Sequence, residues 1–246
     1  MKIRLLLFVQ IICLFLLLPA AQAEGKFNSW EEFNEWFTYY YMHPAPERIP
    51  DGIRYYCDSS MFEKANTHMP MAAFYTALLK EDNDLMRSVY KSITADGSDN
   101  SRVFLLNVLW LANTAESRKL MDDAKSEWKS DEMRDLIVRI EKQKPDNILS
   151  APVKDPARLD MLWGTFLATG KAEPVRKIIS VLHLAEDGHD MELILGSAAK
   201  WSLTSNARQH KRVSEICEEE AKKSTEPTKR LLETVVREAG QKGQKT

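Results

Sequence analysis

The strongest constraint on the fold of this chain is the phrase LWGTFLATGKAEPVRKIISVL at residues 162–182. An apolar segment stops at Gly170, a residue that adopts the left-handed conformation of a helix C-cap at no steric cost. A second segment starts at Glu173 and Pro174. An acidic side chain complements the positive end of a helix, and proline lacks only an N–H that the first turn leaves unpaired. The phrase therefore predicts two antiparallel helices joined by a tight turn.

The same phrase recurs, without gaps over its turn, at two earlier places. Arg87, Arg118 and Arg176 hold one register position in the three hairpins, at separations of 31 and 58 residues. A period near 30 residues is typical of helix–turn–helix units, which hide their apolar faces only by stacking. We therefore expect an all-α domain of stacked antiparallel hairpins, either an α-solenoid or an irregular helical bundle. The three arginines would pair with carboxylates of the next unit or, alternatively, line a groove.

Most of the remaining chain also has apolar residues at helical spacing, and only nine glycines interrupt it. This combination favours helices over strands. Ser29 is expected to cap a first helix that ends near His43. Another helix is expected to begin at Pro70, and two later helices are expected to divide near Asn206.

The N-terminus predicts export. Two cations precede an apolar run over residues 5–18, and the small residues of Ala21-Gln22-Ala23 favour cleavage before Glu24. The run is shorter than the roughly 20 residues that a helix needs to cross a bilayer. We therefore predict a signal peptide at residues 1–23, with an uncleaved anchor as the alternative, and no stable membrane insertion of the mature chain.

The length of the mature chain allows one large domain or two small ones. Loss of two leader cations lowers the formal net charge from −2 to −4, so the chain has no basic field that would favour nucleic acid. We expect one helical domain over residues 24–239 and a disordered polar tail over residues 240–246. The irregular stretch KPDNILSAPVKD, residues 144–155, is a possible internal boundary.

The sequence contains no motif that predicts catalysis. His-Glu-x-x-His, Gly-x-Ser-x-Gly and Walker phrases are absent, and we predict no cofactor and no metal. The stretch HLAEDGHD at residues 183–190 could offer metal ligands, but a solvated turn explains it better. Cys57 and Cys217, which remain after cleavage, could form one disulfide or stay as two buried thiols.

Large aromatic side chains and one arginine are the candidates for binding a partner. Aromatic residues at helical spacing pack in a core more often than they line a groove, so both interpretations stay open. Arg208 begins a short basic cluster that could contact an acidic partner or anionic lipid, or could belong to a mixed solvated face. The candidate surface consists of Trp36, Tyr40, Trp110, Trp163, Trp201 and Arg208.

Four stretches carry a resemblance to known proteins: FTYYYMHPAPERIP, VLWLANTAESRKL, DMLWGTFLATGKAEPVRKII and AAKWSLTSNARQH. Together they resemble a family of uncharacterised, exported bacterial helical proteins, and more loosely the tetratricopeptide-type arrays, whose Trp-Leu-Gly-Tyr consensus is absent here. The resemblance implies a helical fold and a place in the cell envelope, in the periplasm or alternatively outside the cell. It implies no activity.

A protein built from stacked hairpins offers a long surface for other chains. We therefore predict an exported helical-repeat protein that acts as a protein- or peptide-binding or scaffolding module in the envelope, and not an enzyme. The alternative is an envelope hydrolase whose carboxylates meet in a helical cleft.

Overall fold

The computed structural model describes residues 25–128, 131–145 and 147–241, and this part of the chain contains helices and no strand. The predicted all-α class is therefore confirmed. The predicted signal peptide and residues 242–246 of the predicted tail lie outside the described residues. None of the helices in the described ranges combines the length and the apolar character that a bilayer span requires.

The helices follow one another through short connections, except between α7 and α8. They are α1 (Trp30–Tyr39), the short 3₁₀ helix η1 (Pro46–Arg48), α2 (Ile49–Asp58), α3 (Ala65–Leu79), α4 (Asn83–Asp96), α5 (Asp99–Ala112), α6 (Ala115–Glu127), α7 (Asp131–Glu141), α8 (Pro156–Thr169), α9 (Ala172–Ile179), α10 (Leu184–Asp187), α11 (Met191–Gln209), α12 (Lys211–Ala221) and α13 (Thr228–Gly240).

The hairpin predicted at residues 162–182 is present as α8 and α9. The side chain of Asp155 caps α8 by accepting the N–H of Arg158 at 3.0 Å. Gly170 ends α8 with a φ of 63°, and its N–H donates to the carbonyl of Phe166 at 2.7 Å. The next helix begins two residues later, where the Glu-Pro phrase predicts it.

The prediction that a helix begins at Pro70 is wrong, because α3 starts at Ala65 and holds the proline inside it. Side chains that precede the proline support this extra turn. The hydroxyl of Thr67 donates to the carbonyl of Met61 at 2.8 Å, and Nε2 of His68 lies 2.6 Å from the carbonyl oxygen of Phe62. These contacts hold the first turn of α3 against the preceding residues 61 and 62, so the helix begins before the proline.

The predicted boundary between two helices near Asn206 also lies too early in the sequence. The side-chain amide of Asn206 donates to the carbonyl of Ser202 at 2.9 Å within α11. The helix continues to Gln209, and the chain becomes extended only at His210. The buried position of His210, described below, sets this boundary, and no local helix-breaking residue announces it.

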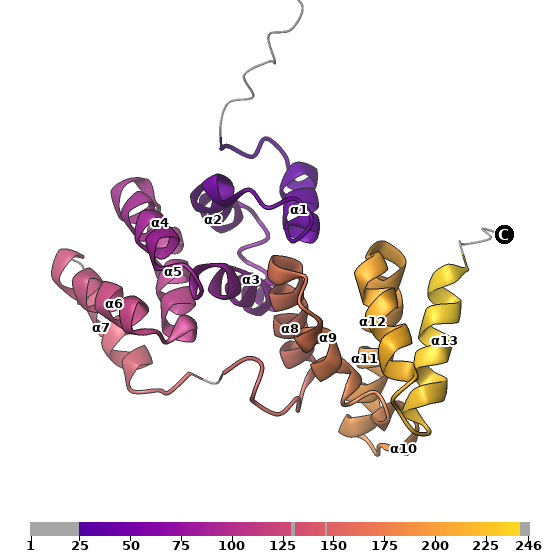
Figure 1. Ribbon diagram of the computed structural model, residues 1–246. Helices are drawn as coiled ribbons and strands as arrows, with labels where there is room; N and C mark the ends of the chain where they lie inside the picture. Colours follow the sequence, from indigo (N-terminus) through magenta and orange to yellow (C-terminus); the bar gives the residue numbers. More distant parts are fainter. Residues whose placement is uncertain (1–24, 129–130, 146, 242–246) are drawn as a thin grey trace, which may run out of the picture.

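Helices α3 and α8 form the centre of the molecule. Residues 71–76 of α3 and residues 161–168 of α8 are all buried, so neighbours enclose these segments of the two helices on every side. The two helices make the most extensive helix–helix contact in the structure. From this pair, α2 and α4–α7 extend to one side and α9–α13 to the other (Figure 1).

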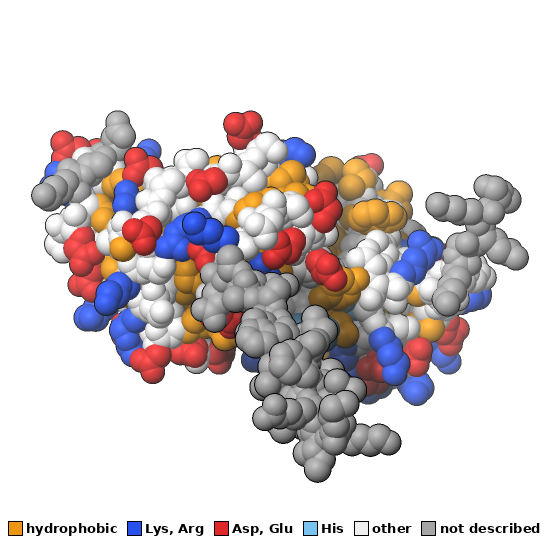
Figure 2. All heavy atoms as spheres, turned by 90° about the horizontal axis from the view of Figure 1, so that it is seen from above, with side chains coloured by type: hydrophobic (Ala, Val, Ile, Leu, Met, Phe, Trp, Pro, Cys, Tyr) orange, Lys and Arg blue, Asp and Glu red, His pale blue; other side chains and the backbone are white. Residues whose placement is uncertain are grey.

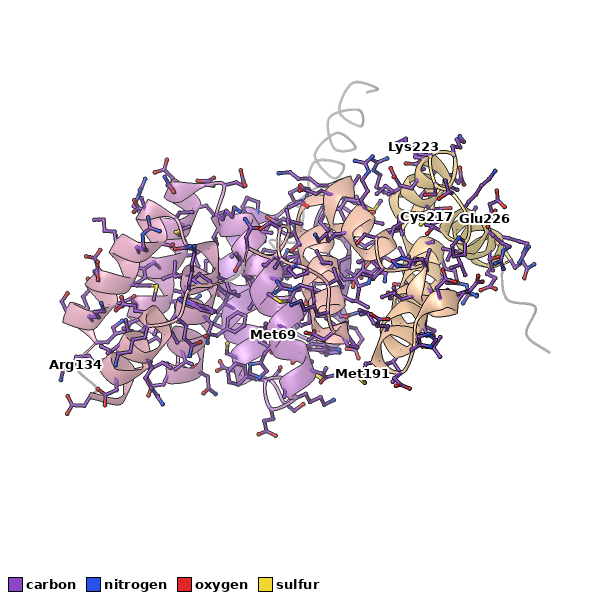
Figure 3. The ribbon with its side chains drawn as sticks, turned by 90° about the horizontal axis from the view of Figure 1, so that it is seen from below. Met69, Arg134, Met191, Cys217, Lys223 and Glu226 are labelled. Atoms are coloured by element: carbon purple, nitrogen blue, oxygen red, sulfur yellow. The ribbon has the colours of Figure 1, made fainter. Side chains whose placement is uncertain are left out.

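The segment between α7 and α8 carries the chain back from one end of the molecule to its centre (Figure 1). Helix α8 then packs against α3 rather than against α6 or α7, which precede it, so the hairpins do not stack in chain order. Buried side chains from both sides of residues 144–155, the predicted internal boundary, belong to one hydrophobic cluster. Figure 3 shows the elongated result, with Arg134 at one end and Glu226 at the other.

The contact between α3 and α8 depends on a glycine. A Cβ atom built on Gly164 would lie 2.1 Å from the carbonyl oxygen of Pro70, far inside contact distance. This oxygen belongs to the backbone and cannot rotate away. Glycine therefore lets the two helix backbones approach as closely as they do.

We expect the variant Gly164→Ala to lose about 2 kcal/mol of unfolding free energy, because overpacking at the α3–α8 contact outweighs the better helix propensity of alanine. Urea unfolding followed by circular dichroism measures this loss. The matched control is Gly240→Ala in α13, where a Cβ atom would have no atom within 4 Å and where no loss is expected. Equal stability of the two variants would contradict the role of the close approach.

A buried histidine joins the end of α1 to the C-terminal arm, which we define as α9–α13. His210 is 1% exposed. Its Nδ1 lies 3.3 Å from the hydroxyl oxygen of Tyr41, and its ring packs against the rings of Tyr39, Tyr41 and Phe166. Its Nε2 has no hydrogen-bond partner among the described residues. Burial lowers the pKa of His210, so the neutral imidazole is the form that fits this site.

Acidification should destabilise the protein through His210. The unfolded chain, with an ordinary histidine pKa of about 6.5, takes up the proton before the folded protein does. Above this pH, the neutral imidazole therefore makes its full contribution to the free energy of unfolding. This contribution is lost as the pH falls toward the lowered folded-state pKa. Urea unfolding of the mature protein at a series of pH values measures the loss.

The variant His210→Phe keeps an aromatic ring in the site but cannot titrate, so its stability should fall less on acidification than that of the wild type. The control is His189→Gln, at an exposed position, which should fall as the wild type does. If wild type and His210→Phe show the same dependence on pH, the neutral buried imidazole is not the cause.

Candidate functional site

Three of the predicted surface aromatics lie in the core. Trp36, Tyr40 and Trp163 are only 8%, 5% and 7% exposed. Trp36 and Tyr40 pack edge to face, and both pack against Phe74 of the central helix α3. Of the two interpretations that the sequence left open, burial in the core therefore holds for these three side chains, and they are no longer candidates for an accessible surface. Helical spacing alone did not reveal that other helices cover the faces on which they lie.

Trp110 fastens the segment between α7 and α8 to the N-terminal half. It is half-buried, and its indole N–H donates to the backbone carbonyl of Gln143 at 3.0 Å. This hydrogen bond holds the first residues after α7 against α5. Trp110 thus makes a structural contact within the protein.

Trp201 is the predicted aromatic that does reach the surface, with 73% of its area exposed. Seven large hydrophobic side chains are exposed in the described part of the chain, and four of them belong to α11: Met191, Leu193, Ile194 and Trp201. Met191, Ile194 and Trp201 follow the spacing i, i+3, i+10, which places them on one face of the helix. We call this set of four residues the α11 stripe.

The surface views agree with this uneven distribution. In Figure 2 charged side chains of both signs are scattered over the N-terminal half, while hydrophobic side chains gather toward the C-terminal half. Figure 3 shows Met191 at the margin of the C-terminal arm, at the start of α11. The stripe is therefore a local feature of one arm.

A groove of about 600 Å³ lies beside the stripe, between α11 and α13. Its walls combine an indole ring, hydroxyl groups and ionised side chains, and we call it the α11 groove. It brings together Trp201 and Arg208, the two predicted candidates that remain accessible. The lining residues are Ala185, Glu186, Ser197, Lys200, Trp201, Thr204, Ser205, Arg208, Leu231 and Glu238.

The cations of the groove lack carboxylate partners. The guanidinium of Arg208 donates to the backbone carbonyl of Glu238 at 3.3 Å, and no carboxylate of the described residues pairs with Arg208 or Lys200. Glu186, by contrast, forms a two-bond ion pair with Arg230, at 2.6 and 3.0 Å. The groove therefore presents two uncompensated positive charges beside an exposed indole.

The sequence reasoning missed Met191, Ile194 and Lys200 as members of this surface. Met191, Ile194 and Trp201 follow a helical period in the sequence, but a buried helix shows the same period. Only the packing reveals that this face of α11 has no neighbour. Lys200 has no sequence signal at all, because an isolated lysine is common on any helix.

The recurring arginines have structural partners. Arg87 of α4 pairs with Glu116 of α6 at 3.0 Å, and Arg176 of α9 pairs with Glu220 of α12 at 2.9 Å. These contacts confirm the prediction that such an arginine pairs with a carboxylate of a neighbouring unit. Arg118 differs, since its guanidinium donates to the side chain and backbone oxygens of Asn113 in its own hairpin.

A second cavity, of about 300 Å³, lies where the C-terminal ends of α3, α5 and α8 meet. The segment before α8 closes one side of it with Pro145 and residues 147–149. Its two carboxylates, Glu81 and Glu173, are exposed, and its lining residues include no histidine. This cavity offers no acid–base pair that would favour the hydrolase alternative, which stays a prediction.

The remaining candidates for chemistry lie apart from both cavities. No group of three or more His, Cys, Asp or Glu side chains in the described ranges is arranged to hold a metal. Cys57 and Cys217 are free thiols, each buried, in α2 and α12 respectively. Burial raises the pKa of each thiol to about 12, so neither supplies a thiolate at neutral pH.

Comparison of the chain with protein-family models, with curated proteins and with solved structures gives no match. The resemblance to exported bacterial helical proteins and to tetratricopeptide-type arrays therefore stays a prediction. A function can therefore be proposed only from the geometry of the α11 groove and from the predicted signal peptide.

Proposed function

We propose that this protein is an exported helical scaffold of the bacterial cell envelope that binds a protein or peptide partner at the α11 groove. The observation that carries the proposal is the concentration of exposed hydrophobic side chains on α11, next to a groove that contains unpaired cations. Exposed apolar patches with a polar rim are typical of sites where other proteins bind.

Trp201 has the properties of an anchor for such a partner. Tryptophan and arginine are enriched among the few residues that dominate binding energy at interfaces. Trp201 and Arg208 lie two turns apart on α11 and line the same groove. A partner that covers both would bury the indole and form hydrogen bonds with the guanidinium at once.

The surrounding helices support the groove as a preformed surface. Helix α11 packs against α10, α12 and α13 along its length and against α8 and α9 at the centre. Arg230 ties α13 to α10 through Glu186 across the groove. A surface on packed helices loses little conformational entropy on binding, which favours affinity. Stacked hairpins that extend from one centre thus serve as a platform for one binding face.

Site-specific cross-linking in the native bacterium tests this function. A photo-reactive amino acid in place of Ser197, an exposed residue that lines the groove, should form a discrete adduct with one envelope protein, because this position lies within contact distance of the partner while Trp201 stays in place. The same amino acid in place of Lys91, an exposed residue of α4, should not form this adduct. N-terminal sequencing of the envelope form should begin at Glu24.

The partner identified in the adduct is then purified for binding measurements. The variant Trp201→Ala should weaken its affinity by about tenfold or more, while leaving the unfolding free energy almost unchanged. The variant Trp163→Ala, which opens a cavity in the core, should instead lower stability. Normal affinity of Trp201→Ala, or the absence of any adduct at position 197 in exported protein, would contradict the proposed function.

A further inference from the structure

We infer that the segment that binds in the α11 groove is an acidic peptide, in which carboxylates flank a large apolar side chain. This inference rests on the proposed function and specifies its partner. It follows from which charges the groove leaves uncompensated and from where they lie relative to Trp201.

The charge balance of the groove is positive. Its ionised lining residues are Lys200, Arg208, Glu186 and Glu238. The ion pair with Arg230 neutralises Glu186, as the two hydrogen bonds at 2.6 and 3.0 Å show. The cations of Lys200 and Arg208 and the carboxylate of Glu238 remain without an ion-pair partner among the described residues.

Several other cations of the same arm are already paired with carboxylates. Arg176 pairs with Glu220 at 2.9 Å, and Arg212 lies 3.5 Å from a carboxylate oxygen of Glu215. No carboxylate of the described residues reaches Lys200 or Arg208. Within the α11 groove, these two charges are the ones available to a partner.

Covering Trp201 removes water from these cations as well. Lys200 and Arg208 are separated by about 12 Å along the helix, with Trp201 between them in the sequence. A partner large enough to bury the indole would leave an unpaired cation at the interface unless it supplied an anion. Truncating one side of such a pair costs several kcal/mol in measured interfaces, so a neutral partner is penalised and a basic partner is repelled.

A peptide fits this surface better than a membrane does. An apolar stripe with tryptophan and basic residues is also found on helices that bind anionic bilayers. Here, however, the groove also contains Glu238, a carboxylate with no ion-pair partner among the described residues. A flat bilayer would desolvate this carboxylate without pairing it, and it could not enter the hollow between α11 and α13. An acidic side chain on a peptide can reach Arg208 without covering Glu238.

Three synthetic amphipathic peptides test the inference. They share one apolar face with a central Phe and differ only in the polar face, which carries Glu, Gln or Lys. Fluorescence anisotropy with the full mature protein should give an affinity about tenfold or more higher for the Glu peptide than for the Gln peptide, and no binding of the Lys peptide. Raising the salt concentration should reduce the preference for Glu, because salt screens exposed charges.

Variants locate the effect in the groove. The double variant Lys200→Gln/Arg208→Gln should bind the Glu and Gln peptides equally, and Trp201→Ala should weaken both. The control Lys211→Gln, whose side chain is 91% exposed on α12, should behave as the wild type. Vesicles of phosphatidylglycerol and phosphatidylethanolamine should not bind through Trp201.

Equal affinity of the wild type for the Glu and Gln peptides would overturn the inference and leave the proposed function standing. Failure of all three peptides to bind, or binding of the vesicles that is lost in Trp201→Ala, would overturn it too. The cross-linking experiment in the native bacterium decides separately whether any protein partner occupies the groove. An error in the predicted acidic character of the partner can therefore be distinguished from an error in the proposed function.

Discussion

The close contact between α3 and α8 is the constraint on which the rest of this structure depends. Residues 71–76 of α3 and 161–168 of α8 are buried on every side, so these segments need apolar neighbours all round. Gly164 allows their backbones to approach at Pro70, where any side chain would collide with a carbonyl oxygen. The two most apolar helices thereby bury apolar surface against each other, and the less apolar helices cover the rest of that surface.

This contact also determines the shape of the molecule. Because α8 returns to α3, the hairpins extend from the centre in two directions, and the segment between α7 and α8 spans the N-terminal half (Figure 1). The turn after α1 joins this centre as well, through the N–H of Tyr41, which donates to the carbonyl of Leu167 at 3.1 Å, and through buried His210. Each arm then ends in helices that no further unit covers.

The exposed stripe on α11 is a consequence of this arrangement. Helices α10, α12 and α13 occupy the other faces of α11, and the face with Met191, Ile194 and Trp201 remains open. The absence of a further hairpin beyond this arm, in the part of the chain that the structure describes, also explains the unpaired cations. In the N-terminal half, Arg87 pairs with Glu116 of a neighbouring hairpin, and no such hairpin of the described residues supplies a carboxylate here. The end of an arm thus combines apolar area and free positive charge, the two properties on which the proposed binding site is built.

The sequence by itself determined the helical class and the helix ends that carry a local capping signal. Gly170, Asp155 and the Glu-Pro phrase specify helix ends through backbone conformation and capping, which act within a few residues, and the period of apolar positions specifies the helical class. The tertiary structure alone decided which apolar faces meet. Trp163 and Trp201 both lie within helices that the apolar pattern predicts, yet one is in the core and the other in solvent. Burial depends on contacts between helices distant in the chain, such as α3 with α8, and helical periodicity does not encode which helices will meet.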